Sequence, residues 1–461
     1  MSAATAAART PERRLAAFVT GFRLADAPED CRRTVRLMVK ANAGTAFAGA
    51  AEDGIAALRA LLCEAGGAPQ ATTFVFGDRL PARAAAQFNA TLCRALDFCD
   101  AMAPGPHIGA ALFPAALAAT ELAGGCSGAD FLQALVVGAE IGSRFNLSEA
   151  QYDGFDPTGV AVVFAATAAA ARILRLDDAQ TVDALALAFN RCGGSFQSHV
   201  DGSLGVRIVQ GWVAEAGVHC AQLARLGCSG PANFLTGHYG YRHLFGRDTL
   251  DADALAADLG DDWRLRRVVF KKYPSCGVTQ GVTELALALV ATLDLDAADV
   301  RTVEVRLPPY AHRLVGHPFR PGANPRVDAQ FSAAYCVANA LTRRASRLRD
   351  FTPAGIDDDA VRSMIARVSV IADPALDARG HTAVDLTVGT TDGARHRRSL
   401  DVAPGFPGAG LDDAQHAARF ADCLAYAPRP PATQRAARLV EAIDALERLG
   451  DARELVGLMQ A

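Results

Sequence analysis

The feature that most constrains the fold is a series of alanine-rich segments with helical patterning, which continues to about residue 260. Gly, Pro or Asp bounds each segment, and these residues commonly start or stop helices. Ser127-Gly-Ala-Asp130, for example, has the pattern of a capping box. Because Ala side chains are small, we expect closely packed helices in a large bundle. The expected helices cover residues 110–124, 131–145, 161–176, 179–189 and 206–226.

The pattern changes after about residue 265. Alternating β-branched residues predict strands, and two apolar helices are expected between them. Helical patterning returns at the C-terminal end. We therefore predict a mainly α fold, in which a large discontinuous helical domain (1–267 and 403–461) accompanies a smaller α+β lid domain (268–402). The expected strands are 303–307, 367–371 and 383–388, and the expected helices are 278–293, 329–342, 412–424 and 434–449.

Composition excludes several classes of function. The 461 residues are 51% hydrophobic and carry a net charge of −4, which gives no basic excess for binding nucleic acid. No apolar run approaches the roughly 20 residues of a membrane span. The 11 Cys contain no C-x-x-C pair, so no metal or iron–sulfur site is predicted. A reducing, cytoplasmic location fits these free thiols.

Lysine is rare in this chain. Of the 46 basic residues only Lys40, Lys271 and Lys272 are Lys. Lys is a compact charge whose pKa falls readily on burial, whereas Arg is effectively always protonated. A retained Lys therefore indicates a place that Arg does not suit, although Lys40 is most simply a surface residue. The adjacent pair lies in a polar segment, 270–276, where the predicted domains meet and where substrates commonly bind.

A second polar segment contains Asp97 and Asp100, followed by a Pro-Gly-Pro turn and His107. If the preceding helix continues, the two carboxylates are three residues apart and share one helix face. Two carboxylates beside an imidazole are suited to general acid–base chemistry. The alternative is a capping Asp and a surface His, which this segment alone favours.

Two further polar segments precede predicted helices. In residues 152–158, Asp156 or Thr158 is most simply an N-cap, although a role in a site is also possible. In residues 197–203, His199 lies in a loop of small polar residues, where a solvated position is favoured over a site.

Together and in this order, these segments resemble the MmgE/PrpD family, which includes 2-methylcitrate dehydratase, cis-aconitate decarboxylase and iminodisuccinate epimerase. The similarity runs through most of the chain. It rests on FNAT at 88–91, ALDF at 95–98, FPAA at 113–116, SGADF at 127–131, VGAE at 137–140, GFDPT at 154–158, GCSGP at 227–231, KKYP at 271–274 and QFSAAY at 330–335.

The resemblance implies a homodimeric enzyme with this two-domain fold, which acts on a small carboxylate without any metal or organic cofactor. It also places four residues of this chain at positions that line the family's pocket. These predicted catalytic residues are Asp97, His107, Lys271 and Tyr335. The predicted substrate-binding residues are Cys99, Asp100, Asp156, His199 and Arg207.

Departures from the family pattern are concentrated in the same segments. A second carboxylate is replaced by Cys99, an imidazole by Asp156, a lysine by Val206, and a histidine of some members by Gln280. These changes lower the positive charge expected in the pocket. A citrate-like trianion should bind less well, because each lost charge contact is worth roughly 1–3 kcal/mol.

Three hypotheses follow for the function. The first is a lyase, a dehydratase or decarboxylase, that abstracts a proton beside a carboxylate or carbonyl. In this hypothesis His107 is the general acid or base, and Asp97 or Asp100 orients its ring. The second is an isomerase, epimerase or cyclase acting on a less anionic metabolite. The third, a non-catalytic binding protein, is disfavoured because the four predicted catalytic residues, Asp97, His107, Lys271 and Tyr335, are all present.

Overall fold

The computed structural model describes residues 10–322 and 324–461. The chain divides into two compact units. The first comprises the described residues up to Val268 together with Ala427–Ala461, and the second is Val269–Tyr426. The first unit is thus built from both ends of the chain.

Helix α9 (Pro157–Ile173) is the centre of the first unit, and its side chains from Val160 to Ala171 are at most 1% exposed. It contacts α6 (Gly109–Leu122), α7 (Gly128–Arg144), α10 (Asp178–Phe189) and α12 (Gly205–Arg225). These are the helices predicted from the alanine-rich pattern, with ends that differ by a few residues. Further helices of this unit are α2 (Pro11–Gly21), α3 (Glu29–Ala48), α4 (Ile55–Ala65), α5 (Ala82–Arg94), α8 (Glu149–Tyr152), α11 (Gln197–Val200), α13 (Tyr241–Leu244), α14 (Ala252–Leu255), α22 (Thr433–Asp444) and α23 (Glu454–Leu458).

Small residues allow these helices to approach closely, as the composition predicted. A Cβ atom added at Gly217 of α12 would lie 2.4 Å from the Cβ of Ala166 in α9. That separation is far below van der Waals contact, so a larger residue here would force the two helices apart. Ser127 caps α7, since its Oγ accepts from the Asp130 N–H at 3.1 Å.

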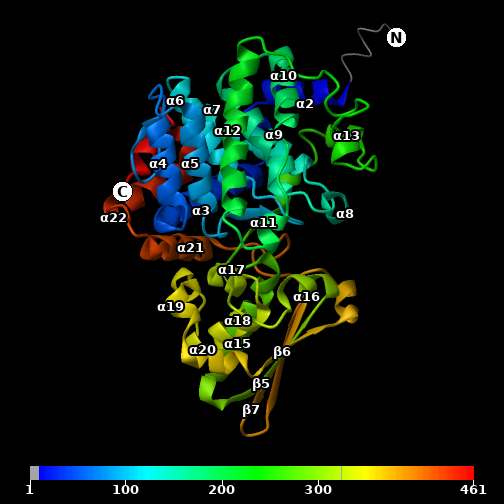
Figure 1. Cartoon of the computed structure of the whole chain (residues 1–461), viewed down its shortest axis with the longest axis vertical. Coiled ribbons are helices and arrows are strands. Elements are labelled where there is room, and N and C mark those ends of the chain that lie inside the picture. The colour runs from blue at the N-terminus through cyan, green and yellow to red at the C-terminus, as the bar shows by residue number, and fades with distance from the viewer. Residues whose placement is uncertain (1–9, 323) are drawn as a thin grey trace. The chain divides into compact units, whose positions relative to one another are not determined.

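The C-terminal helices α22 and α23 join the N-terminal helices of the first unit (Figure 1). The Gly128 N–H donates to the Leu449 carbonyl at 2.9 Å, and the Ala452 N–H donates to the Cys126 carbonyl at 2.9 Å. Lys40 of α3 lies 2.6 Å from Asp444 of α22. Lys40 therefore has an ion-pair partner rather than the bare surface position expected for it.

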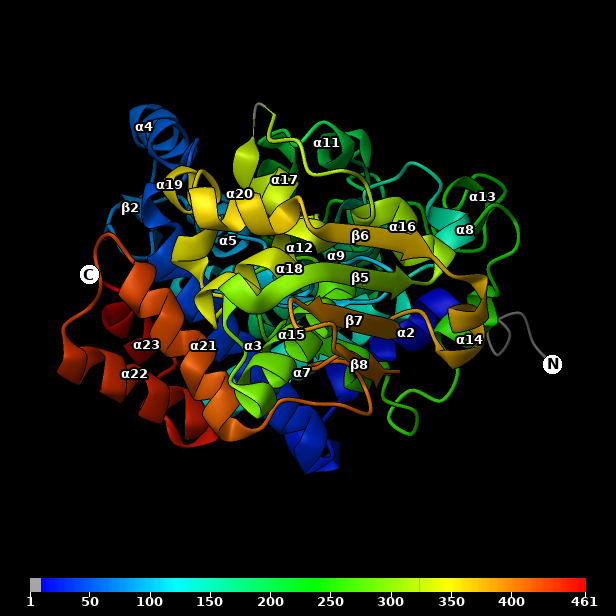
Figure 2. The same cartoon turned by 90° about the horizontal axis from the view of Figure 1, so that it is seen from below.

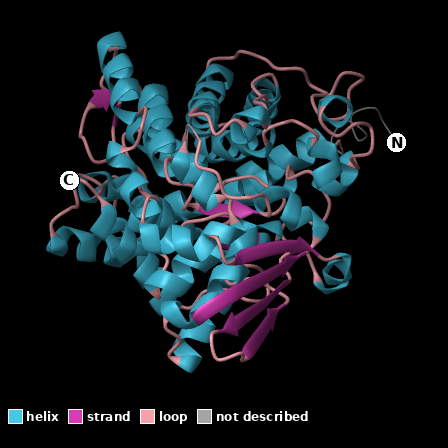
Figure 3. Ribbon diagram, turned by 60° about the horizontal axis from the view of Figure 1, so that its bottom comes forward, coloured by secondary structure: helices cyan, strands magenta, loops and turns pink. Residues whose placement is uncertain are grey.

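The second unit contains a four-stranded sheet of order β6-β5-β7-β8 (Figure 2). Its strands are β5 (Val300–Leu307), β6 (Val368–Ala372), β7 (Val384–Thr390) and β8 (Arg395–Leu400). β5 pairs in parallel with β6 and antiparallel with β7, which pairs antiparallel with β8. Helices cover part of the sheet, as Figure 3 shows. Those in contact with its strands are α15 (Gln280–Leu293), α16 (Pro309–Val315) and α18 (Ala333–Arg343). The other helices of this unit are α17 (Pro325–Gln330), α19 (Pro353–Ile356), α20 (Asp359–Ile365) and α21 (Asp413–Tyr426).

The second unit continues to Tyr426, past residue 402, where we expected the lid to end. Side chains of α21 account for this difference. Asp422 accepts a hydrogen bond from the Leu348 N–H at 2.9 Å, and the Tyr426 hydroxyl accepts one from Arg326 at 2.7 Å. Both contacts attach α21 to the second unit.

Within the described parts of the chain, none of the helices combines the length and the apolar character that crossing a membrane requires.

A buried ion pair ties the 255–265 segment to α7. Glu140 and Arg144 have fully buried side chains, and Arg144 Nε lies 2.6 Å from Glu140 Oε1. The guanidinium also donates to the carbonyls of Leu255 and Asp262 at 3.1 and 2.8 Å. Glu140 accepts the Leu265 N–H at 3.1 Å. Burial raises the pKa of Glu140, so its charge depends on these partners.

We predict that Arg144→Met destabilises the first unit by about 3–5 kcal/mol, because it leaves the Glu140 charge buried without a cation. Urea unfolding followed by circular dichroism measures the loss. Arg23→Met is the control, since the Arg23–Asp26 pair is on the surface and its removal should leave the midpoint unchanged. Equal urea midpoints for the Arg144→Met and Arg23→Met variants would contradict the role of Arg144 as the counter-charge of Glu140.

Candidate active site

The segment between α5 and α6 carries three predicted site residues. Helix α5 ends at Arg94, so the continuing helix that would have placed Asp97 and Asp100 on one face is not present. Asp97 instead adopts a left-handed backbone conformation, with φ 53°, and Asp100 begins the short strand β3 (Asp100–Met102). Because the backbone turns at Asp97, the carboxylates of Asp97 and Asp100 contact different partners.

The Asp100 carboxylate is fully buried and bonded to the protein. Oδ1 accepts from Asn42 Nδ2 of α3 at 2.7 Å, and Oδ2 accepts from the Gly109 N–H at the start of α6 at 2.9 Å. A Cβ at residue 109 would lie 2.3 Å from Asp100 Oδ1, so only Gly admits this approach. These contacts favour a structural role for Asp100 over the predicted contact with substrate.

His107 is buried and its ring is fixed through Nδ1. Nδ1 lies 2.8 Å from the Asp100 carbonyl oxygen and 3.3 Å from Cys99 Sγ. A carbonyl only accepts, so Nδ1 carries the proton of the neutral ring. Nε2 lies 3.7 Å from Asp97 Oδ1. The backbone of Asp100, rather than either carboxylate, therefore orients the imidazole.

Two other helices hold the backbone of His107. Its N–H donates to the Thr158 hydroxyl of α9 at 3.1 Å. Its carbonyl accepts from Gln210 Nε2 of α12 at 2.9 Å. Three segments distant in the sequence thus determine where the ring lies.

Arg94 is a buried cation that the sequence interpretation did not include. Its Nη1 donates to Asp97 Oδ1 at 2.6 Å, and its side chain is 5% exposed. Burial alone would lower the pKa of Arg94, but the charges of Asp97, Cys99 and Asp156 outweigh burial and raise it. Its position three residues before Asp97 is the signal that could have revealed it.

Asp156 both caps a helix and binds His199. Oδ1 accepts from the Gly159 N–H at 3.1 Å, which confirms the N-cap interpretation for α9. Oδ2 lies 3.2 Å from His199 Nε2. The His199 ring also stacks on Phe196, with centroids 4.6 Å apart. His199 is therefore half-buried and partnered, rather than a solvated loop residue.

Arg207 lies one helical turn before Gln210 on α12, so both face the same side. Its Nη2 is 3.8 Å from Glu52 Oε2, and its Nη1 donates to the Asp53 carbonyl at 3.3 Å. The first unit thus holds four carboxylates, of Glu52, Asp97, Asp100 and Asp156, beside the guanidinium groups of Arg94 and Arg207.

In the second unit, Lys271 directly follows strand β4 (Val268–Phe270) and is 3% exposed. The turn after it is held by Gln280, whose amide accepts the Tyr273 N–H at 2.9 Å and donates to the Tyr273 carbonyl at 3.0 Å. Gln330 Nε2 donates to the Pro274 carbonyl at 3.0 Å. Gln280 therefore shapes the turn that follows Lys271.

Lys272 has a different environment from its neighbour. Its Nζ lies 3.0 and 2.8 Å from the two oxygens of Glu284, one of which also accepts from the Tyr273 hydroxyl at 2.6 Å. Lys272 is thus committed to an ion pair within the second unit.

Tyr335 lies in the hydrophobic core of the second unit and is fully buried. Its hydroxyl donates to the Asp350 carbonyl, and its ring packs between Phe319 and Phe351. Burial raises the pKa of this hydroxyl. These contacts favour a structural role over the predicted catalytic one.

No group of three or more His, Cys, Asp or Glu side chains suited to a metal ion occurs within residues 10–322 and 324–461.

Comparison with known sequences identifies the family. The sequence model of the MmgE/PrpD N-terminal domain matches residues 13–252, and that of the MmgE/PrpD C-terminal domain matches residues 273–445. The chain therefore belongs to the MmgE/PrpD family, and its mainly α fold is the one that the sequence predicted. The chain is 25% identical over 330 residues to the cis-aconitate decarboxylase-like protein oryM of Aspergillus oryzae. This match covers 66% of this chain and 68% of that protein. The family includes dehydratases and decarboxylases, so an enzyme is indicated at this coarse level.

We predict that Arg94→Met lowers kcat/KM by about 10²-fold, because Asp97 loses the cation that holds it. Loss of this positive charge also makes proton uptake by His107 easier, so the acidic limb of the pH–rate profile should move to higher pH. Arg94→Lys should recover part of the activity. The control is Arg83→Met on the same helix, because Arg83 is half-exposed and 3.7 Å from Glu215. An unshifted profile in a folded Arg94→Met variant would show that Arg94 does not act on His107.

Proposed function

We propose that this protein is a cofactor-independent lyase, a dehydratase or decarboxylase, that abstracts a proton beside a carboxylate or carbonyl of a small carboxylic acid. The observation that carries the proposal is the fixed tautomer of His107. Because Nδ1 donates to the Asp100 carbonyl, Nε2 of the neutral ring has the lone pair that takes a proton. A homodimer, which the family resemblance implies, and a cytoplasmic location, which the free thiols favour, belong to the same proposal.

The neighbours of Nε2 support its role as a base. When His107 takes a proton, the imidazolium that forms lies 3.7 Å from the Asp97 carboxylate, which stabilises the new charge. Arg94 holds that carboxylate in place. Asp97 is thus proposed to stabilise the protonated base, and Arg94 to position Asp97.

Abstraction of the proton leaves negative charge on the substrate as an enolate-like species. Arg207 and Lys271 are the cations proposed to stabilise it. Arg207 is buried beside Glu52, which offsets part of its charge. A compact ammonium at Lys271 is therefore the more important of the two in this proposal. In a dehydratase, the enolate-like species then expels the neighbouring hydroxyl, which takes up a proton and leaves as water. In a decarboxylase, the order is reversed: the C–C bond to the carboxylate breaks, CO₂ leaves, and the enolate-like carbanion takes a proton from the imidazolium of His107.

The charges of the first unit favour a substrate with fewer negative charges than citrate. Among the candidate-site residues of that unit, the carboxylates of Glu52, Asp97, Asp100 and Asp156 accompany the two guanidinium groups of Arg94 and Arg207. This balance supports the second candidate, an isomerase, epimerase or cyclase acting on a less anionic metabolite. Both candidates share the enolate-like species and a proton transfer to or from its carbon.

Solvent exchange tests that common step. We expect the protein to incorporate deuterium from D₂O into its substrate, beside the carboxylate or carbonyl, in a screen of small mono-, di- and tricarboxylic acids read by NMR. His107→Ala should slow exchange by about 10²–10⁴-fold, the usual contribution of a general base. Retention of full exchange by this variant would remove His107 from the mechanism. Absence of exchange or turnover across the whole screen would favour a binding protein.

The two adjacent lysines provide a matched test of the proposed cation. Lys271→Arg keeps the charge but replaces the ammonium with a broad planar group, and we expect it to lower kcat/KM by about 10²-fold or more. Lys272→Arg should cost little, because Arg can keep the pair with Glu284. Near-normal activity of both variants would make Lys271 structural.

A further inference from the structure

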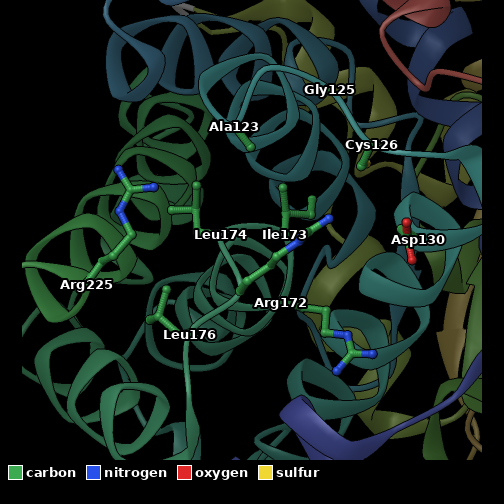
Figure 4. Close-up of a pocket in the computed structure, with 10 residues that line it drawn as sticks. Ala123, Gly125, Cys126, Asp130, Arg172, Ile173, Leu174, Leu176 and Arg225 are labelled. Carbon is green, nitrogen blue, oxygen red and sulfur yellow. The ribbon is translucent and has the colours of Figure 1, made fainter.

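A cavity of about 550 Å³ lies in the first unit where three helices end (Figure 4). Ala123 follows α6, Ile173 ends α9 and Arg225 ends α12, and all three line the cavity. In the figure, Arg225 and Asp130 lie on opposite sides, with Ile173 and Leu174 between them. Cavities of this volume hold small organic molecules.

Three guanidinium groups line this cavity, and one of them is already bonded. Arg172 donates to the carbonyls of Thr20 and Phe22 at the end of α2, the latter at 3.0 Å. Burial lowers its pKa. Arg172 therefore serves as a cap for α2.

Arg175 and Arg225 differ from Arg172. Both are exposed to the cavity, and neither guanidinium makes a hydrogen bond or ion pair with any residue in the described ranges 10–322 and 324–461. Arg175 also has a left-handed backbone, with φ 57°. Arg is unfavourable there compared with Gly or Asn, although a left-handed residue commonly ends a helix, as Arg175 does after α9.

The charge of the cavity is positive. Asp130 is the acidic residue in its lining, and its carboxylate accepts a hydrogen bond from the Ser127 hydroxyl at 2.8 Å. The three helix ends add partial negative charge, which a nearby arginine offsets. If Arg175 and Arg225 only offset the partial charge of the helix ends, removing their guanidinium groups would change stability but not ligand binding.

We propose that this cavity binds a small organic anion with two negative charges, a dicarboxylate or a phosphate monoester, through the guanidinium groups of Arg175 and Arg225. Guanidinium groups bind both kinds of oxyanion by paired hydrogen bonds. The site is separate from the candidate active site. Asp156 caps the start of α9, and the cavity lies at the other end of this 17-residue helix, about 25 Å away.

Isothermal titration calorimetry of the full chain with succinate and with glycerol 3-phosphate tests the proposal. We expect saturable binding of one or both probes, and the probe that binds more tightly shows whether the cavity prefers a dicarboxylate or a phosphate monoester. The double variant Arg175→Gln/Arg225→Gln should weaken binding about tenfold or more. Arg301→Gln, an exposed arginine of β5, is the matched control and should bind as the parent protein does.

Arg207→Gln separates this site from the candidate active site. If binding persists in this variant and is lost in the double variant, the cavity is the binding site. The proposal is overturned if the double variant, shown to be folded by thermal melting, binds as tightly as the parent protein. It is also overturned if neither probe saturates below about 10 mM, or if Arg207→Gln alone abolishes binding. These outcomes are independent of the lyase proposal, because binding is measured without turnover.

Discussion

The buried Asp100 is the residue on which the arrangement of the candidate site depends. Its carboxylate joins Asn42 of α3 to the first N–H of α6 at Gly109, while its backbone carbonyl holds the ring of His107. A buried carboxylate is costly unless it is fully bonded, and the N-terminus of a helix favours negative charge. One residue therefore determines where α6 begins and which nitrogen of His107 carries the proton.

Arg94, at the end of α5, completes this arrangement from just before the turn at Asp97. Asp97 sits in a left-handed conformation that costs free energy, and the ion pair with Arg94 offsets part of that cost. Because the side chains of Arg94 and Asp97 are only 5% and 13% exposed, their charges interact more strongly with neighbouring charges than they would in water.

Most of the fold was predictable because periodicity is a local property. The alanine-rich helices and the strands β5, β6 and β7 lie close to their predicted bounds. Strand β8 was missed, since its residues, RHRRSL, show no apolar alternation. It pairs only with β7 at the edge of the sheet and has little apolar surface to bury. The attachment of α21 was also missed, because it depends on single hydrogen bonds that Asp422 and Tyr426 accept from residues far away in the sequence.

By itself, the sequence determined the family, the helical character of most of the chain and the residue types gathered around His107. Those features follow from local patterns and from motifs that lie in order along the chain. Only the tertiary structure decided what each side chain does. It turned Asp100 and Tyr335 inward to backbone partners, and it brought Arg94 to Asp97. The physical reason is that such contacts depend on a left-handed turn and on helices far apart in sequence, whose approach no local pattern records.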